Sequence, residues 1–556
     1  MKLISIDLFT INILTKVKKL LKYFLLALYS TPFIIHAQNQ VPIISNVEAN
    51  LDLINKAVYV NFDLNDEEGD EMEVWIQASV DGGKTWAIPI ISDSLSGDYG
   101  DLILSGNGKS IIWSYDEYLL SNYSQGLTTL QIRVIADDHI EIPLSEIVAK
   151  VDSARIVSSL YQYEGIRNHF TDPAFKNKII DSLETLFGQA DIYNYRHGPM
   201  YGGYQIENII GFSSGTRTPQ NSWLTSAHYD TVDNSPGTDD NGTGMVAVAE
   251  AVRILSDYNT KNSLRYLFFD LEEYGLIGSQ FYVNTGVPFW ENMQGLINMD
   301  MIGYYSDEPY SQTLPVGFDF LYPEMYSDLV DDSWRGNWIG SIFNNLATNL
   351  NNDFTDIAET YVPDLKIHGL TVPGNGELVP DLRRSDHAPF WDIGVPSLFL
   401  TDCANFRNPY YHTLNDVIST VNIDFLINNI KAIVTTLALK AELEHSAKME
   451  SNIMELELTL ENIELKLEQN SIVSFPNPSD GIQDFQINLI HGGMVKFIIN
   501  DMTGRVIDIT SSQWMPYGQS VYNYNKNLSE GYYYVSLELD GQVVSSNNLI
   551  IYSHSH

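Results

Sequence analysis

The chain has 556 residues, of which 71 are acidic and 31 basic, so its formal net charge at pH 7 is −40. Such a surface repels nucleic acid and anionic lipid, and we therefore expect neither as a partner. The single cysteine, Cys403, excludes an internal disulfide framework and a metal site built from several thiolates. The length favours two to four domains.

The first residues have the pattern of an export signal. Several lysines precede a short apolar run over residues 23–35, and Ala37 offers a small residue for cleavage. The run is too short for a comfortable membrane span. We therefore expect residues 1–37 to be a signal peptide. The mature protein would be exported through the periplasm, would be secreted or held at the cell surface, and would have no stable membrane span.

Residues 38–145 have a β pattern. Residues 72–80 read MEVWIQASV, a turn signal follows at 81–84, and residues 130–135 alternate between apolar and polar. This pattern resembles a fibronectin type III-like or immunoglobulin-like sandwich. An acidic stretch within it, at residues 63–70, lacks the spacing of a known calcium loop, and we interpret it as a solvated loop.

Residues 146–447 change character. Strand-like runs at 205–211, 223–228, 264–270 and 294–300 alternate with helical stretches such as 245–257. Alternation of this kind predicts an α/β fold whose mostly parallel sheet is flanked by helices. Residues 304–380 form a long insertion, with a helical piece around 325–350 followed by a loop. The insertion could wall a substrate pocket or could be decoration.

The end of the chain returns to a β pattern. Residues 448–471 are expected to be a linker, although 452–468 alternate as a strand would. Residues 472–556 contain FPNPSDG and LSEGYYYV and predict a small separate β domain. This domain resembles the C-terminal sorting domain of the type nine secretion system in Bacteroidetes. The resemblance implies that the secretion machinery is a partner.

The stretch with the clearest chemistry begins where a predicted strand ends at His228. Asp230 follows on the same strand face and could fix the orientation of the imidazole. Asp240 then lies at the start of a predicted helix, beside Asp239 and Asn241, which is more polar groups than capping requires. Because histidine and carboxylates are ligands that suit zinc, the sequence indicates a metal site at these strand ends.

Three further segments supply candidate residues. Glu272 and Glu273 follow an apolar strand, which suggests one metal ligand and one general base. Asp300 stands alone at an otherwise apolar strand end, where an unpaired carboxylate would be costly and a metal partner accounts for it. His387 and His412 are both possible ligands, and spacing alone does not choose between them.

Six motifs occur in order over residues 155–445: H-x-D, G-x-D-D-N-G-T-G, E-E-x-G-L-x-G-S, N-M-D-M-I-G, S-D-H-x-x-F and Y-H-T-x-x-D. Together they resemble the two-zinc aminopeptidase family that includes bacterial leucyl aminopeptidases, aminopeptidase Y and glutamate carboxypeptidase II. The resemblance implies a zinc exopeptidase-like fold and two zinc ions per chain. It assigns one zinc to His228, Asp240 and Asp300, and the other to Asp240, Glu273 and His412. Glu272 would be the general base, and His387 would lie nearby without binding metal.

We therefore expect a secreted zinc metallo-aminopeptidase that removes N-terminal residues from peptides or proteins by means of a water activated between two zinc ions. Glu272 and Asp230 would serve catalysis, Asp230 through the imidazole that it orients. A glutaminyl cyclase-like acyltransferase, which shares this fold and uses one zinc, is one alternative. A non-catalytic surface-binding protein is another. Zinc content and hydrolysis of an aminoacyl anilide separate the three.

Overall fold

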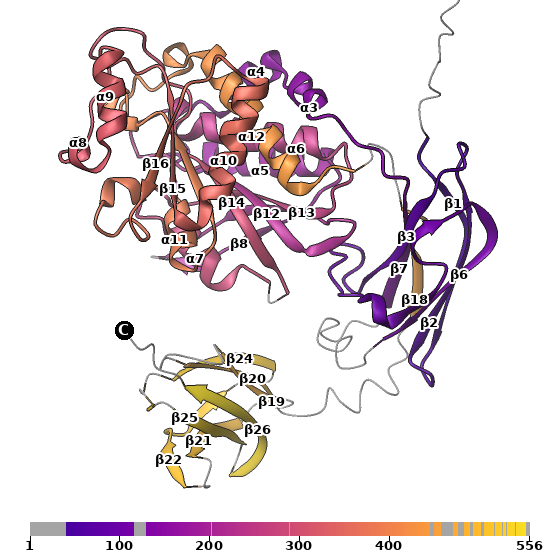
Figure 1. The fold of residues 1–556 in the computed structure, drawn as a ribbon. Helices are drawn as coiled ribbons and strands as arrows, with labels where there is room; N and C mark the ends of the chain where they lie inside the picture. Colours follow the sequence, from indigo (N-terminus) through magenta and orange to yellow (C-terminus); the bar gives the residue numbers. More distant parts are fainter. Residues whose placement is uncertain are drawn as a thin grey trace, which may run out of the picture.

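The computed structural model describes residues 40–551 except 116–128, 202, 289, 445–449, 458–470, 476–482, 490–492, 502–504, 516–517, 525, 527, 530 and 540. The predicted signal peptide lies outside the described residues. Within the described part of the chain, no helix is both long enough and apolar enough to cross a membrane. Figure 1 shows the arrangement of the elements.

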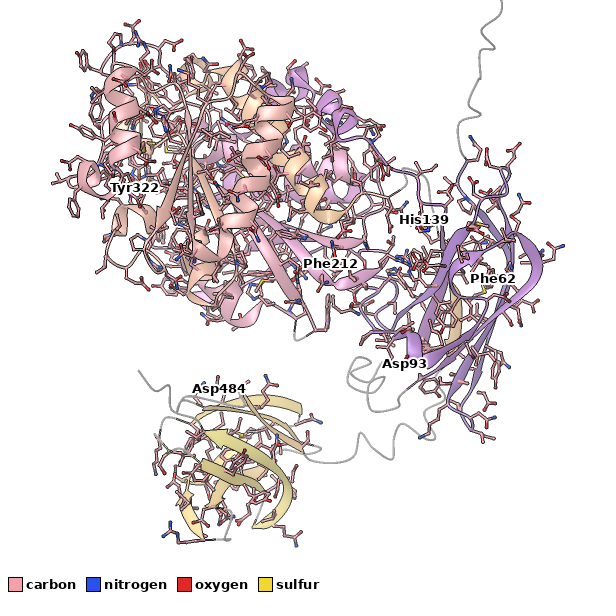
Figure 2. All side chains as sticks on the ribbon, in the orientation of Figure 1. Phe62, Asp93, His139, Phe212, Tyr322 and Asp484 are labelled. Atoms are coloured by element: carbon pink, nitrogen blue, oxygen red, sulfur yellow. The ribbon has the colours of Figure 1, made fainter. Side chains whose placement is uncertain are left out.

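Two β-sheets pack face to face in the N-terminal part. One has the strand order β1-β2-β6-β4 and the other β18-β7-β3-β5. The strands are β1 (Ile43–Asp52), β2 (Ala57–Asn65), β3 (Met72–Ser79), β4 (Leu95–Gly97), β5 (Gly100–Ile103), β6 (Gly106–Ser114), β7 (Thr129–Asp137) and β18 (Met454–Glu457). Alternate residues of β2, among them Phe62, which is labelled in Figure 2, are buried between the sheets with Trp113 and Val134. This arrangement is a β-sandwich.

One strand of this sandwich comes from a distant part of the chain. Strand β18 pairs antiparallel with β7, with Met454 opposite Ile132. It lies within residues 448–471, for which a linker was expected. The alternating pattern of this stretch therefore reflects a true strand, whose partner is more than 300 residues away in the sequence and could not be read from the pattern.

The central part is built on an eight-stranded sheet with the order β16-β15-β17-β14-β12-β13-β11-β8. The strands are β8 (Tyr193–His197), β11 (Asn208–Ser213), β12 (Thr218–His228), β13 (Asn262–Phe269), β14 (Asn292–Met299), β15 (Ile339–Asn344), β16 (Ile367–Val372) and β17 (Ser397–Thr401). The central strands β13, β12, β14 and β17 pair in parallel, as do β15 and β16. Strand β11 is antiparallel to β8 and β13, and β15 is antiparallel to β17. The α/β class is confirmed, and the sheet is mixed, with parallel strands at its centre.

Helices cover both faces of this sheet because successive strand residues are buried on opposite sides. Tyr266 and Phe268 of β13 belong to the core under one set of helices, and Leu267 and Phe269 belong to the core under the other. The first set is α3 (Leu144–Lys150), α4 (Ser153–Tyr163), α5 (Pro173–Gln189), α6 (Gly244–Leu255), α10 (Thr348–Tyr361) and α12 (Ile423–Ala441). The second set is α7 (Ile277–Thr285) and α11 (His387–Asp392).

The insertion at residues 304–380 differs from its prediction. The expected helical piece at 325–350 is instead the end of helix α9 (Pro323–Asp331), strand β15 and the start of α10. Strand β16 follows where a loop was expected, so the insertion extends the central sheet. Together with α8 (Phe318–Leu321), these elements enclose a separate apolar core that includes Met325, Trp338 and Leu370. Strand β15 reads IGSIFN, and its Gly340 and Ser341 weaken the apolar pattern from which strands are predicted.

Three smaller features complete the fold. Strands β9 (Met200–Tyr201) and β10 (Tyr204–Gln205) pair antiparallel. The sandwich contacts the central part through Trp75. Its indole N–H donates to the carbonyl of Thr216 at 2.6 Å, and the guanidinium of Arg217 lies 3.9 Å from the centre of the Trp75 ring.

The C-terminal strands share a core of their own. They are β19 (Ser471–Phe475), β20 (Gln483–Leu489), β21 (Gly493–Asp501), β22 (Val506–Ile509), β23 (Gln513–Met515), β24 (Gly518–Tyr524), β25 (Gly531–Leu539) and β26 (Gln542–Ile551).

Candidate active site

The predicted site residues follow the carboxyl ends of neighbouring parallel strands. His228 is the last residue of β12, Asp300 comes directly after β14, and Glu272 and Glu273 come shortly after β13. Asp240 lies in the segment Thr238–Thr243 that leads into α6, where its own backbone is not helical. His412 comes from the loop between β17 and α12. Because β14, β12 and β13 are adjacent in the sheet, these loops meet at one edge.

The side chains form two groups that meet at Asp240. In the first group, Nε2 of His228 lies 3.5 Å from Oδ1 of Asp240 and 3.5 Å from Oδ1 of Asp300. In the second group, Nε2 of His412 lies 3.1 Å from Oδ2 of Asp240 and 3.0 Å from Oε2 of Glu273. Each carboxylate oxygen of Asp240 therefore faces a different histidine. Glu272 adjoins the first group, with Oε2 at 3.9 Å from Nε2 of His228.

The side chains of these two groups are arranged as metal ligands rather than as hydrogen-bond partners of one another. Nε2 of His228, Nε2 of His412 and Oδ2 of Asp240 are buried and form no hydrogen bond within the described part of the chain. Two ligands about 2.0–2.1 Å from one tetrahedral zinc lie roughly 3.3 Å apart, which is close to the spacings seen here. Ligand atoms of His228, Glu272 and Asp300 gather within 4.8 Å of one another, and so do those of Asp240, Glu273 and His412. Imidazole nitrogen and carboxylate oxygen are donors that suit zinc.

Several buried carboxylates crowd together in the candidate site, and burial together with this crowding raises the pKa of two of them. Burial raises the pKa of Glu273 to about 7, and the neighbouring Asp240 adds to the shift. Burial also raises the pKa of Glu272 well above its usual range, against the opposing effect of His228. The pKa of His412 reaches about 10, because the carboxylates of Asp240 and Glu273 outweigh the effect of burial. A bound cation would relieve this crowding of buried carboxylates.

Asp230 lies between His228 and the loop that carries the two glutamates. Its carboxylate accepts the backbone N–H groups of Glu272 at 3.0 Å and of Glu273 at 3.3 Å. Nδ1 of His228 lies 3.2 Å from the backbone carbonyl oxygen of Asp230 and 3.6 Å from its Oδ1. The nearest acceptor for the imidazole is therefore the backbone carbonyl of Asp230, and its carboxylate also holds the loop that carries both glutamates.

Two residues to which the sequence gave no role hold the Asp240 turn. Asp416, the last residue of the Y-H-T-x-x-D motif, accepts the backbone N–H groups of Asp239 at 2.8 Å and of Asp240 at 3.1 Å. The fully buried Arg167 donates to the carbonyl of Tyr229 at 2.7 Å and to that of Gly237 at 2.7 Å. It thus joins the loop after His228 to the turn before Asp240. Arg167 lies in an irregular segment between α4 and α5, where no spacing pattern could have identified it.

His387 belongs to neither ligand group. Its Nε2 lies 3.0 Å from the carbonyl oxygen of Leu382, and its ring stacks on Phe399 at 4.4 Å between centres. Burial lowers the pKa of His387 to about 3, so the ring is neutral. These contacts give His387 a packing role beside the site.

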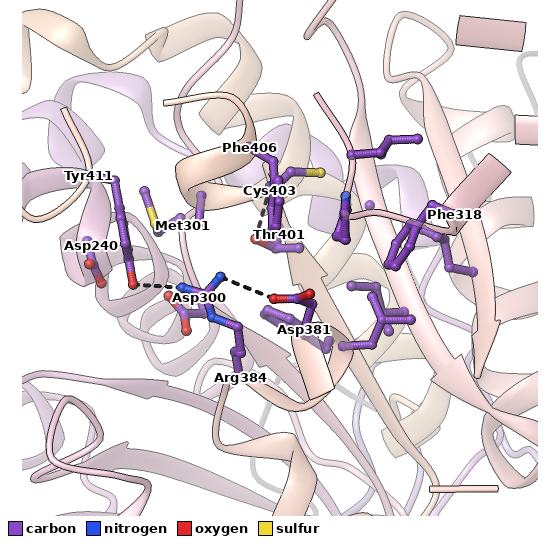
Figure 3. Close-up of a pocket in the computed structure, with 18 of the residues that line it drawn as sticks. Asp240, Asp300, Met301, Phe318, Asp381, Arg384, Thr401, Cys403, Phe406 and Tyr411 are labelled. Carbon is purple, nitrogen blue, oxygen red and sulfur yellow. Dashed lines mark hydrogen bonds and ion pairs between the residues drawn. The ribbon is translucent and has the colours of Figure 1, made fainter. Parts of the chain in front are cut away.

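An apolar pocket adjoins the two ligand groups. Asp240, Glu272, Glu273 and Asp300 form its acidic end. Its apolar lining comes largely from the insertion and the segments after it, namely Leu314, Pro315, Phe318, Met325, Trp338, Ile342, Leu370, Leu382 and Phe399. Figure 3 shows Asp240 and Asp300 toward one end and Phe318 toward the other. Arg384 lies between them and donates to the hydroxyl of Tyr411 at 3.1 Å.

Comparison with known proteins matches part of the chain to one family. Residues 208–437 match the model of peptidase family M28. The chain is 25% identical over 222 residues to the uncharacterized protein YfbL of Escherichia coli K12, a match that covers 38% of this chain and 64% of that protein. It is 26% identical over 227 residues to aminopeptidase YwaD of Bacillus subtilis 168, covering 39% of this chain and 40% of that protein.

Among solved structures, BSAP, a zinc aminopeptidase from Bacillus subtilis, is 23% identical with a TM-score of 0.32, over 44% of this chain and 52% of that one. The chain thus spans less than two thirds of the length of each of these proteins. The matched residues nevertheless include every predicted metal ligand and Glu272. Residues 208–437 therefore resemble peptidase family M28.

Proposed function

We propose that this protein is a zinc-dependent aminopeptidase that binds two zinc ions per chain. The observation that carries the proposal is the pair of ligand groups that share Asp240 at the acidic end of an apolar pocket. One zinc would be held by His228, Asp240 and Asp300, and the other by Asp240, Glu273 and His412. The likeness to a protein named as an aminopeptidase, YwaD, supports the same reaction class.

Bound zinc would supply the positive charge that polarises the scissile carbonyl and acidifies a water molecule. Glu272 is the group of this chain best placed to take a proton from that water, since its Oε2 lies 3.9 Å from Nε2 of His228, farther away than the carboxylates of the two proposed ligands at 3.5 Å. Its position beside the first ligand group lets it pass that proton on to the leaving amine. Asp230 keeps Glu272 in place through the backbone of its loop.

The shape of the pocket supports cleavage at an amino terminus. An apolar side chain can fill the part lined by Phe318, Trp338 and Leu370, because these residues present no charge. The protonated α-amine of the same residue would then lie at the acidic end, among carboxylates. We therefore propose that large apolar N-terminal residues are the preferred substrates.

The test measures zinc content and hydrolysis of leucinamide on the same preparation of the full mature chain. We expect about two zinc ions per chain, loss of hydrolysis after chelation and recovery when zinc is restored. His412→Ala should lower both zinc content and activity. His197→Ala is the matched control, because this histidine lies on β8 and contacts Thr285 at 3.1 Å, outside both ligand groups. Full hydrolysis after verified removal of metal would contradict the proposal, and cyclisation of N-terminal glutamine without hydrolysis would favour a glutaminyl cyclase.

We also propose that the protein is exported, with residues 1–37 as signal peptide and 472–556 as sorting domain for the secretion machinery. The separate core of strands β19–β26 supports an independent C-terminal unit. Deleting residues 472–556 should abolish release or surface display in the native host while leucinamide hydrolysis by the purified protein persists. Unchanged export of the shortened chain would refute this role.

A further inference from the structure

An aromatic cluster is exposed next to the candidate active site. We call it the aromatic rim and define it as His169, Phe170, Tyr204 and Tyr274. Phe170 is 52% exposed, Tyr274 43% and Tyr204 37%. The ring of Phe170 lies 4.6 Å from that of Tyr204 and 5.4 Å from that of Tyr274, and the ring of His169 lies 4.2 Å from that of Tyr204. Contiguous exposed rings of this kind mark binding surfaces.

Hydrogen bonds hold the rim against the loops that carry the site. Tyr274 directly follows Glu273, and its hydroxyl accepts the side-chain N–H of Asn168 at 2.9 Å. The same amide donates to the backbone carbonyl of Thr231 at 2.7 Å, just after Asp230. Asn168 is itself buried. The rim is therefore fixed to the loops at the ends of β12 and β13.

The rim and the apolar pocket are built by different segments. Apart from the four acidic residues, the pocket lining comes from residues 301–411, whereas the rim comes from residues 169–274. Glu272 and Glu273 line the acidic end of the pocket, and the next residue along the chain is Tyr274 of the rim. The loop 272–274 thus joins the reacting centre to the rim.

We propose that the aromatic rim binds the side chains of the substrate residues that follow the scissile bond. This inference rests on the proposed aminopeptidase function. If the N-terminal side chain fills the pocket and the scissile bond lies over the ligand groups, the carboxyl side of the peptide leaves along the loop that continues from Glu273 into Tyr274. There it meets three aromatic faces, which attract apolar and aromatic side chains. The enzyme therefore selects a large apolar second residue as well as the first.

The test compares three substrates with the same first residue: Leu-Phe-Ala, Leu-Gly-Ala and leucinamide, which has nothing after the scissile bond for the rim to bind. The wild-type protein should show a higher kcat/KM for Leu-Phe-Ala than for Leu-Gly-Ala. Phe170→Ala and Tyr204→Ala should each lower the ratio of kcat/KM for Leu-Phe-Ala to kcat/KM for Leu-Gly-Ala by roughly 2- to 10-fold, the range expected for one lost aromatic contact. Hydrolysis of leucinamide should not change, because that substrate does not reach the rim.

Phe320→Ala is the matched control, since Phe320 lies on α8, is 85% exposed and belongs neither to the rim nor to the pocket lining. The ratio of kcat/KM for the two tripeptides should be the same in Phe320→Ala as in the wild type. Thermal melting should show that all variants are folded. An unchanged ratio in both rim variants, or an equal fall for all three substrates, overturns the inference while leaving the aminopeptidase intact. Failure of the wild-type protein to hydrolyse leucinamide would instead reject the proposed function, and the inference with it.

Discussion

The carboxylate of Asp230 accepts the backbone N–H of Glu272 at 3.0 Å. This bond joins the end of β12, which carries His228, to the loop after β13, which carries both glutamates. The second carboxylate oxygen accepts the N–H of Glu273. One buried side chain thus fixes the proposed base and a proposed ligand relative to the histidine two residues before it, so its loss should affect all three.

Asp230→Asn should therefore impair catalysis without removing a ligand. An amide has one acceptor oxygen instead of two, so one of the N–H groups of Glu272 and Glu273 loses its partner. We expect a fall in kcat, or in zinc affinity, of about 10- to 100-fold, as for other residues that support metal ligands. Steady-state kinetics and zinc titration measure the two effects. Asp233→Asn, an exposed aspartate in the same loop, should behave like the wild type.

Replacing each glutamate of the Glu272-Glu273 pair separates base from ligand. Glu272→Gln keeps the size and polarity of the side chain but cannot take up a proton. It should retain near-full zinc while kcat falls by about 10²- to 10⁴-fold. Glu273→Gln should instead weaken the zinc shared with His412, whose Nε2 lies 3.0 Å from the carboxylate, and added zinc should partly restore activity. Zinc stoichiometry and kcat are measured side by side, and loss of zinc from Glu272→Gln alone would reverse the two roles.

The sequence pointed to residues that the structure brings together because they lie in short motifs at strand ends. His228, Asp300 and the Glu272-Glu273 pair each follow an apolar run, and parallel strands bring such ends together. The choice between His387 and His412 required the family resemblance, because both histidines lie in polar motifs at similar distances from a strand. Of these two histidines, His412 is the one that contacts the carboxylates of Asp240 and Glu273 in the structure.

What the sequence did not reveal depends on contacts between distant segments. The role of Asp230 follows from backbone amides some 40 residues away, and backbone groups leave no trace in a motif. Strand β18 finds its partner across the whole central part of the chain. The aromatic rim combines rings from two loops and the short strand β10, and these segments are too short for helical or strand periodicity. Strand β15 was missed because Gly340 and Ser341 interrupt its apolar pattern.

Arg167→Met should destabilise the protein. The guanidinium donates to the carbonyls of Tyr163, Tyr229 and Gly237 in the fully buried interior. Methionine fills similar space but leaves these oxygens without donors, at a cost of about 3 kcal/mol or more in the free energy of unfolding. Urea unfolding measures the loss, and zinc affinity should fall with it because the loops of His228 and Asp240 separate. Arg155→Met, which removes an exposed arginine of α4, should change neither; equal effects of the two variants would contradict the prediction.

The last prediction concerns pH and Glu444, whose carboxylate accepts the hydroxyl of Thr216 in a buried position near the sandwich. Burial raises the pKa of Glu444 from 4.5 to about 7, although the Thr216 bond opposes the shift. Between these two pH values the folded state holds a proton that the unfolded state has lost. The stabilising contribution of Glu444 is therefore complete below pH 4.5 and is lost as pH rises through 7, an effect of about 3 kcal/mol.

Glu444→Gln removes this dependence, because glutamine stays neutral and its carbonyl oxygen can still accept the Thr216 hydroxyl. The free energy of unfolding of the variant relative to the wild type should thus rise between pH 5 and pH 8, with the variant the more stable at pH 8. Glu442→Gln is the contrasting control. The bond from Lys261 lowers the pKa of Glu442, so its loss should destabilise the protein at neutral pH instead. Urea unfolding of the three proteins at both pH values decides the matter, and a Glu444→Gln variant less stable than the wild type at pH 8 would show that the fold stabilises the charged carboxylate, so that its pKa is not raised.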